Sequence, residues 1–176
     1  MFAHRIPPSK VRAMFEISHE GPLDGPPIEL LLDAAFGSER HDRPSYFLRD
    51  NIAPAAELCF VARRGAELAG SIRFWPLAIP GVQSALLLGP IAVDAAHGNL
   101  GIGSGLIEHG LAAAHSRGHD AVAAIGAAPY LRRFGFLPAY RFALEFPAEV
   151  APDRFHAMEL QPGALAAGGL LAKASG

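Results

Sequence analysis

A continuous apolar segment that runs into a glycine-rich turn is the feature that most limits what this chain can fold into. Residues 85–93 (ALLLGPIAV) have the composition of a buried strand, and residues 97–106 (HGNLGIGSGL) follow as a turn and the start of a helix. Backbone N–H groups in the first turn of a helix have no partner within the helix, and the helix dipole adds partial positive charge there. We therefore expect this turn to bind a phosphate or pyrophosphate without a basic side chain.

The spacing of the glycines argues against two common nucleotide-binding motifs. Leu106 stands where a G-x-G-x-x-G fingerprint needs its third glycine, and no acidic residue closes the next apolar run, residues 121–125. A Walker loop needs Gly-Lys followed by Ser or Thr, and the turn has no lysine. A nicotinamide site and nucleotide hydrolysis are therefore disfavoured, while a helix start with glycines only for a tight turn stays an alternative for this segment alone.

Gly89-Pro90 interrupts the apolar strand in its middle. Proline donates no hydrogen bond to a ladder and is confined to edges, bulges and strand starts, so we expect the strand to bend or part from its neighbour here. An extended ligand with amide groups then pairs with the exposed backbone of residues 91–93 while its phosphates reach the glycine turn. Pantetheine joined to pyrophosphate has this shape.

Three segments, in their order and separation, resemble the GCN5-related N-acetyltransferases (GNAT), in particular a bacterial branch of small predicted acetyltransferases with an Arg-Phe-Gly-Phe segment. They are residues 87–93 (LLGPIAV), residues 101–103 (GIG) with the helix that follows, and residues 129–136 (PYLRRFGF). The resemblance implies an α/β (α+β) fold, with a mixed, mostly antiparallel sheet whose two central strands are parallel and splayed and are flanked by helices. It also implies acetyl-CoA as the cofactor.

The resemblance places coenzyme A along the split strand and the glycine turn. The residues it implies for cofactor binding are Ile91, Ala92, Val93, Gly98, Asn99, Leu100, Gly101, Ile102, Gly103, Ser104 and Arg133. The backbone N–H groups near residues 91–93 are also the candidates for polarising the thioester carbonyl. Arg133 either reaches a phosphate or pairs with a carboxylate.

Gly98 and Asn99 depart from the family pattern, which has Gln or Arg at the first position and commonly glycine at the second. Because main-chain amides bind the pyrophosphate, we expect this change to weaken the site modestly and not to abolish it. Leu131 stands where the family has a tyrosine, the presumed proton donor to the leaving thiolate. Tyr130 is the nearest hydroxyl, and it either donates this proton or only packs against the helix.

A polar segment, residues 38–44, offers the candidates for the base that deprotonates the amine. These are His41, Glu39 and Asp42, of which we assign His41, although a charged loop is often only solvated and a chain of water molecules is an alternative. The predicted activity is direct transfer of an acetyl group from acetyl-CoA to a primary amine of a small molecule, without a covalent enzyme intermediate. A non-catalytic acyl-CoA-binding or sensing module and a protein N-acetyltransferase are the alternatives.

Length and composition favour one domain, with a core over about residues 12–160 and a tail over residues 163–176. The chain has 176 residues, of which 51% are hydrophobic, enough to bury one substantial core. The net charge of −2 and the lack of a basic run argue against a nucleic-acid partner.

No apolar run is long enough to span a bilayer and no signal peptide is evident, so we expect a cytoplasmic protein without a membrane partner. The resemblance also suggests a homodimer.

Neither the cysteine nor the histidines predict a covalent or metal site. Cys59 lies within an apolar run, so we expect it to be buried and inert. His115 and His119 are four residues apart, but they flank a helix end and lack a third ligand, so no metal is expected. We expect His97 to be a solvent-exposed residue of the cofactor loop.

The hydrophobic patterns also place the regular elements. Strands are expected at residues 12–18, 58–63, 67–77, 85–93, 121–125 and 154–160, and helices at residues 28–36, 45–51, 100–117 and 127–134. The tail is expected to be a weak helix or a docking segment with a disordered end.

Overall fold

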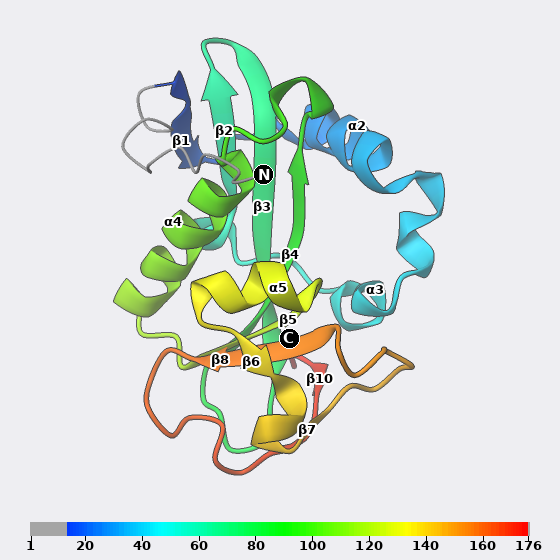
Figure 1. Cartoon of the computed structure of the whole chain (residues 1–176), viewed down its shortest axis with the longest axis vertical. Helices are drawn as coiled ribbons and strands as arrows, with labels where there is room; N and C mark the ends of the chain where they lie inside the picture. Colours follow the sequence, from blue (N-terminus) through cyan, green and yellow to red (C-terminus); the bar gives the residue numbers. More distant parts are fainter. Residues whose placement is uncertain (1–13, 176) are drawn as a thin grey trace.

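A mixed sheet forms the centre of the computed structural model, which describes residues 14–175 (Figure 1). The eight-stranded sheet has the order β1-β2-β3-β4-β5-β8-β6, with β10 paired to β3, and β7 pairs with β9 separately. The strands are β1 (Glu16–His19), β2 (Phe60–Arg64), β3 (Glu67–Ala78), β4 (Ala85–Val93), β5 (Ala121–Ile125), β6 (Leu137–Pro138), β7 (Leu144–Glu145), β8 (Phe155–Glu159), β9 (Gly169–Leu170) and β10 (Ala172–Lys173). Within the larger sheet only β4 and β5 pair in parallel, which confirms the predicted architecture.

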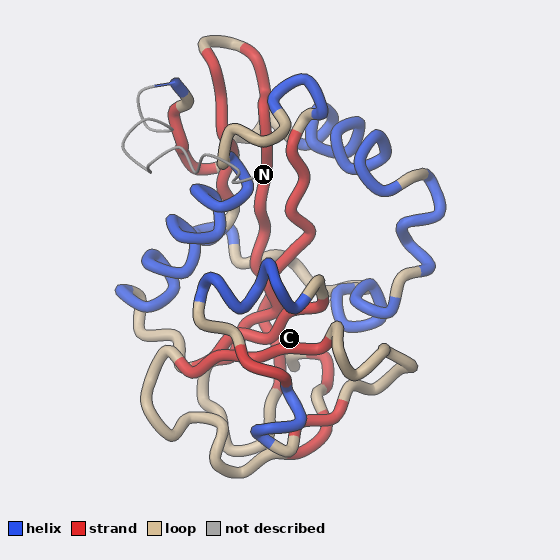
Figure 2. The backbone as a smooth tube through the Cα atoms, in the orientation of Figure 1, coloured by secondary structure: helices blue, strands red, loops and turns tan. Residues whose placement is uncertain are grey.

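Two helices cover opposite faces of strands β2 to β4 (Figures 1 and 2). The helices are α2 (Gly25–Phe36), α3 (Pro44–Arg49), α4 (Ile102–Ser116) and α5 (Ala128–Leu131), joined by the 3₁₀ turns η1 (Ser38–Asp42), η2 (Ala56–Leu58), η3 (Ala95–His97), η4 (Arg132–Phe134) and η5 (Ala139–Phe142). The apolar stripe of α4, with Leu106 and Ile107 fully buried, packs on one face, and Ile28 and Leu32 of α2 pack on the other. No helix among the described residues is both long and apolar enough to cross a membrane.

Most predicted elements are present, with small shifts at their ends. Helix α2 begins three residues before the predicted start because Pro26 and Pro27 fit its first turn, where a missing N–H leaves no helical hydrogen bond unmade. The predicted first strand, residues 12–18, is found as β1 at Glu16–His19, and its first two residues lie outside the described part of the chain.

Of the two predictions for the tail, the helix is wrong, and the docking segment is found. Residues 163–175 form turns and the short strands β9 and β10, and Leu165 and Leu171 are buried. Gly168 and Gly169 have φ of 61° and 110°, which no right-handed helix contains. Strand β10 pairs with the end of β3, Ala172 opposite Ala78, so the tail docks by extending the sheet.

Helix α4 approaches β3 very closely at Gly110. A Cβ atom built on Gly110 would lie 2.4 Å from Cε2 and 2.7 Å from Cζ of Phe74, whose side chain is completely buried. A methyl group therefore cannot enter without moving a rigid ring in the core.

Gly110→Ala is expected to lower the free energy of unfolding by about 2 kcal/mol, because the contact at 2.4 Å places the overpacking cost at about 3 kcal/mol, the top of its usual range, and the better helix propensity of alanine returns about 1 kcal/mol. Urea unfolding followed by circular dichroism measures this. As a control, Ala112→Gly on the exposed side of the same helix is expected to cost only about 1 kcal/mol through propensity. A Gly110→Ala protein as stable as wild type would contradict the prediction.

Candidate active site

Strands β4 and β5 part in the middle of the sheet, as the position of Pro90 predicts. Their parallel pairing runs from Ala85 opposite Ala121 to Leu88 opposite Ala124 and ends there. Beyond Leu88, β4 pairs only with β3 among the described strands, with a register shift opposite the Gly89-Pro90 step. One edge of residues 89–93 is therefore left without a partner strand, which exposes backbone groups to a ligand.

An indole holds the chain at the point where the two strands separate. The Trp75 Nε1–H donates a hydrogen bond of 2.7 Å to the carbonyl oxygen of Gly89, which has φ of 115°. This bond satisfies a carbonyl just beyond the end of the β5 ladder. The bend is thus fixed by a side chain from β3.

The glycine turn after β4 has the geometry that an anion site needs. Asn99 and Gly101 adopt left-handed conformations, with φ of 63° and 80°, and no side chain caps α4. The N–H groups of residues 102–104 therefore have no partner within the helix. Gly98 has φ of −60°, so its backbone does not require glycine.

The structure brings the predicted cofactor residues together, because the end of β4 leads through the turn into α4. Two of these residues can offer a ligand only their backbone groups, because their side chains are buried. Ala92 packs with residues of α2, and Ile102, the first residue of α4, packs in the core. His97 is also buried, at 8% exposure, with its ring against Phe15 and its Nε2 3.1 Å from Glu67 Oε1. The expectation that His97 is solvent-exposed is therefore wrong, since the sequence does not show that two distant residues enclose it.

A cation and a hydroxyl lie beside the first turn of α4. Arg133 donates a hydrogen bond of 3.3 Å from Nη2 to Ser104 Oγ, and its guanidinium lies 5.3 Å from the centroid of the Tyr130 ring. It forms no ion pair with a described carboxylate. Its charge is therefore available to an anion at this helix terminus.

The Tyr130 hydroxyl lies between the end of β4 and the start of α4. A Cβ atom built on Gly103 would be 3.0 Å from this oxygen and 3.6 Å from Val93 Cγ2. The hydroxyl has no hydrogen-bond partner among the described residues. By contrast, Leu131 is 3% exposed and packs in the core cluster, so Tyr130 supplies the hydroxyl at this place.

Two cavities meet at the separation of the strands. A cavity of about 270 Å³ lies between the ends of β4 and β5, α3 and α5, and a larger one of about 750 Å³ is bounded by α2, η1, α3 and β3. They share Arg40, Arg43, Tyr46, Arg49 and Pro90. A molecule in the larger cavity can therefore reach the exposed edge of β4.

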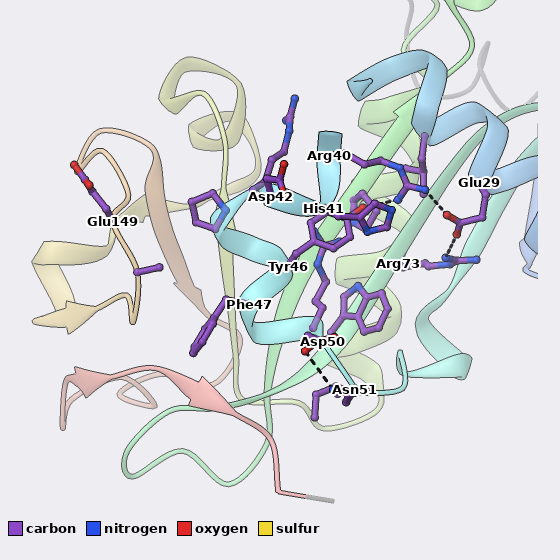
Figure 3. A pocket seen from close by; sticks show the side chains of 18 residues that line it. Glu29, Arg40, His41, Asp42, Tyr46, Phe47, Asp50, Asn51, Arg73 and Glu149 are labelled. Carbon is purple, nitrogen blue, oxygen red and sulfur yellow. Dashed lines mark hydrogen bonds and ion pairs between the residues drawn. The ribbon is translucent and has the colours of Figure 1, made fainter. Parts of the chain in front are cut away.

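A network of ion pairs forms one wall of the larger cavity (Figure 3). Arg40 bonds to Asp33 at 2.8 Å and to Glu29, and Glu29 also accepts from Arg73 at 3.2 Å. Burial by itself lowers the pKa of Arg40, but hydrogen bonds to Asp33, Glu29 and Tyr46 outweigh burial and hold this pKa above its usual value. These linked side chains give the wall a fixed arrangement of charged groups.

Among the candidate bases, the structure places His41 and Asp42 on the larger cavity, whereas Glu39 does not line it. The His41 ring is edge-on to Tyr46, with ring centroids 4.7 Å apart. Figure 3 shows His41 near the wall formed by Arg40.

Cys59 is buried, as predicted, at 3% exposure, and burial raises the pKa of its thiol to about 11. It is therefore a thiol and not a thiolate near neutral pH. Within residues 14–175, no group of three or more His, Cys, Asp or Glu side chains is placed to hold a metal ion.

The arginines and aromatic rings of the larger cavity were not predicted from the sequence. Arg40, Arg49 and Arg73 come from three elements, and the first two lie in or beside a charged segment that is typical of a solvated loop. Their partners are distant: Arg73 bonds to Glu29, 44 residues away. The one signal in the sequence was that Arg49 has no Asp or Glu four residues before or after it to pair with on a helix.

Comparison with known proteins decides the family. The family model described as the acetyltransferase (GNAT) family matches residues 26–136, which is more than half of the sequence. The chain belongs to the GNAT family. No curated protein matches this GNAT sequence significantly.

Solved GNAT structures share the architecture. A GNAT family N-acetyltransferase of Escherichia coli, YhbS, in complex with CoA, has a TM-score of 0.79 and 26% identity over 92% of this chain and 90% of its own. A GNAT family acetyltransferase of Brucella melitensis, in complex with acetyl-CoA, has a TM-score of 0.65 and 28% identity over 84% of this chain and 89% of its own.

The ribosomal-protein-S18-alanine N-acetyltransferase of E. coli has a TM-score of 0.57 but only 17% identity, over 84% of this chain and 95% of its own, so it shows the fold alone. Its acceptor is therefore not carried over to this chain, and the acceptor has to be argued from the site.

Proposed function

We propose that this GNAT protein is an N-acetyltransferase that moves the acetyl group of acetyl-CoA to a primary amine of a small molecule. The observation that carries this proposal is the free edge of β4 beyond Leu88, which begins where two cavities meet and leads into the uncapped start of α4. One continuous surface thus offers sites for a cofactor, a thioester and an acceptor.

Acetyl-CoA binds with its pyrophosphate at the first turn of α4 and its pantetheine along residues 91–93. The pyrophosphate accepts hydrogen bonds from the N–H groups of residues 102–104, and Arg133 adds positive charge. The pantetheine amides pair with the free edge of β4 as an added strand would. The complexes of the two bacterial relatives with CoA and acetyl-CoA support this choice of cosubstrate.

In the transfer step, the neutral amine attacks the thioester carbonyl carbon. A C–N bond forms as the C–S bond breaks, and backbone N–H groups of residues 91–93 stabilise the charge on the carbonyl oxygen. The departing thiolate takes a proton from the Tyr130 hydroxyl, and the amine nitrogen loses a proton to His41 directly or through water. No acyl-enzyme forms, and Cys59 takes no part because it is buried and protonated.

The larger cavity supports a small-molecule acceptor. Its volume of about 750 Å³ falls within the about 300–1,000 Å³ of typical small-ligand sites. Aromatic side chains, Tyr46, Phe47 and Trp75, line it together with many charged groups, so it is more polar than most small-ligand pockets and suits a polar acceptor.

Two measurements test the proposal. Calorimetry with acetyl-CoA is expected to show binding at one site, and a thiol-release assay over a panel of primary amines is expected to show turnover with at least one of them. Binding without release from any amine would instead favour an acyl-CoA-sensing module. A calorimetric trace that stays flat at millimolar acetyl-CoA would remove the cofactor site itself.

A further inference from the structure

Arg49, near the C-terminal end of α3, lies in the wall shared by the two cavities. Arg49 is 6% exposed to solvent. The guanidinium donates to Ser45, from Nε to the carbonyl oxygen at 3.3 Å and from Nη2 to Oγ at 2.8 Å. The Cζ atom of Arg49 lies 4.1 Å from the centroid of the Tyr46 ring and 5.6 Å from that of the Trp75 ring. These contacts hold the group in one orientation, and its Nη1 donates to no described residue.

Arg49 differs from the other enclosed arginines in having no acidic partner. Arg40, Arg63 and Arg73 each form at least one ion pair with Asp or Glu, whereas no described carboxylate pairs with Arg49. Burial lowers the pKa of Arg49 to about 10, and the nearby charges of Arg40 and Arg73 act in the same direction.

The smaller cavity carries an excess of positive charge. Four arginines, Arg40, Arg43, Arg49 and Arg154, line it without any Asp or Glu, and although Arg40 is paired with Asp33 and Glu29, no described carboxylate pairs with the other three. An enclosed charge without a counter-ion is unfavourable, so an anion that enters this cavity gains a strong electrostatic partner. The planar guanidinium with a free terminal nitrogen is suited to a carboxylate or phosphate oxygen.

We propose that Arg49 binds a carboxylate carried by the acceptor, so that the substrate is an amino acid or another amine with a nearby carboxylate. This inference rests on the proposed acetyl transfer. The acceptor is favoured as the source because Arg49 also faces the larger cavity, while the acetyl group is uncharged and the cofactor phosphates have their own cation in Arg133. A dicarboxylic acyl-CoA, such as succinyl-CoA, is the other possible source of a carboxylate.

The test compares matched acceptors in wild type and Arg49→Met. Each pair has the same amine with a free carboxylate or with that carboxylate amidated, and a third compound carries a phosphonate instead. Wild type is expected to prefer the carboxylate. In Arg49→Met, KM for the carboxylate compound is expected to rise about 10- to 100-fold, which is the affinity usually lost with a hydrogen bond between charged groups. The kcat for this compound is expected to stay nearly unchanged, and KM for the amide is expected to be unaffected.

Three further measurements separate this role from a structural one. Arg49→Lys keeps the charge and is expected to recover part of the lost affinity, and Arg117→Met, an exposed arginine just beyond α4, is expected to leave every constant unchanged. Thermal unfolding of Arg49→Met is expected to match wild type, since the variant removes a buried charge without orphaning a carboxylate. Calorimetry with acetyl-CoA is expected to be unchanged.

Several outcomes would overturn the role of Arg49. These are equal use of carboxylates and amides by wild type, a preference for the phosphonate, equal KM changes for both members of a pair, or an Arg49→Met defect confined to succinyl-CoA as donor. If acetyl-CoA binds but no amine turns over, the proposed activity fails by itself. Calorimetry of the carboxylate and amide compounds with acetyl-CoA-loaded protein then tests Arg49 separately, because wild type should bind the carboxylate more tightly than the amide and Arg49→Met should lose this difference.

Discussion

Tyr130→Phe is expected to lower kcat for acetyl transfer by about 10²- to 10⁴-fold, the usual contribution of a general acid. Tyr130 lines the smaller cavity together with Gly89 and Ile91, where the thioester can reach the free edge of β4, and its hydroxyl has no hydrogen-bond partner among the described residues. Removing it therefore leaves the thiolate without its proton donor. Steady-state kinetics across the pH range measures the effect.

The same variant should leave the fold and the cofactor site intact. The ring of Tyr130 packs edge-on against Phe134, with centroids 5.3 Å apart, and phenylalanine keeps this contact. Acetyl-CoA affinity and thermal stability are expected to match wild type. Tyr140→Phe, at a tyrosine that is 70% exposed, serves as the control and should keep full activity. Wild-type rates for Tyr130→Phe at every pH would refute the acid role.

Ser104→Glu is expected to weaken acetyl-CoA binding by about 10³-fold. It places a negative charge in the first turn of α4, where the pyrophosphate binds, and two like charges about 4 Å apart near a protein surface repel by about 4 kcal/mol. The new carboxylate also lies within reach of Arg133, which already bonds to Ser104 at 3.3 Å, and would take the cation away from the cofactor. Calorimetry with acetyl-CoA measures the loss.

The effect of Ser104→Glu on stability should have the opposite sign. An acidic residue in the first turn of a helix stabilises it by about 0.3–1 kcal/mol, and α4 has no acidic residue there. Thermal unfolding without ligand is therefore expected to occur at a slightly higher temperature than in wild type. Ser104→Ala, the control without charge, should bind acetyl-CoA within a few-fold of wild type. Tight binding by Ser104→Glu would mean that the pyrophosphate lies elsewhere.

The sequence was most informative where local chemistry determines structure. Pro90 predicts the parting of β4 and β5 because proline cannot donate to a ladder, and the glycine turn predicts the start of α4 because the chain needs a left-handed conformation at Gly101. Residue types at adjacent positions decide both features. No contact between distant segments is needed to predict them.

Features that depend on distant contacts were predicted poorly. His97 is buried because Phe15 and Glu67 enclose it, and the tail is extended because β3 offers an unpaired edge at Ala78. The larger cavity is the clearest case, since α2, α3 and β3 each contribute one wall. A charged segment looks the same in sequence whether its arginines face water or a cavity, so Arg49 could not be singled out.

The pairing of β10 with β3 joins the end of the chain to the helix that carries Arg49. Lys173 Nζ lies 3.7 Å from Asp50 Oδ2 and 5.4 Å from the centroid of the Phe47 ring, on and just after α3. Asp50 and Phe47 both line the larger cavity. A substitution or insertion at Lys173 would therefore act beside the larger cavity, although β10 itself contributes no residue to its lining.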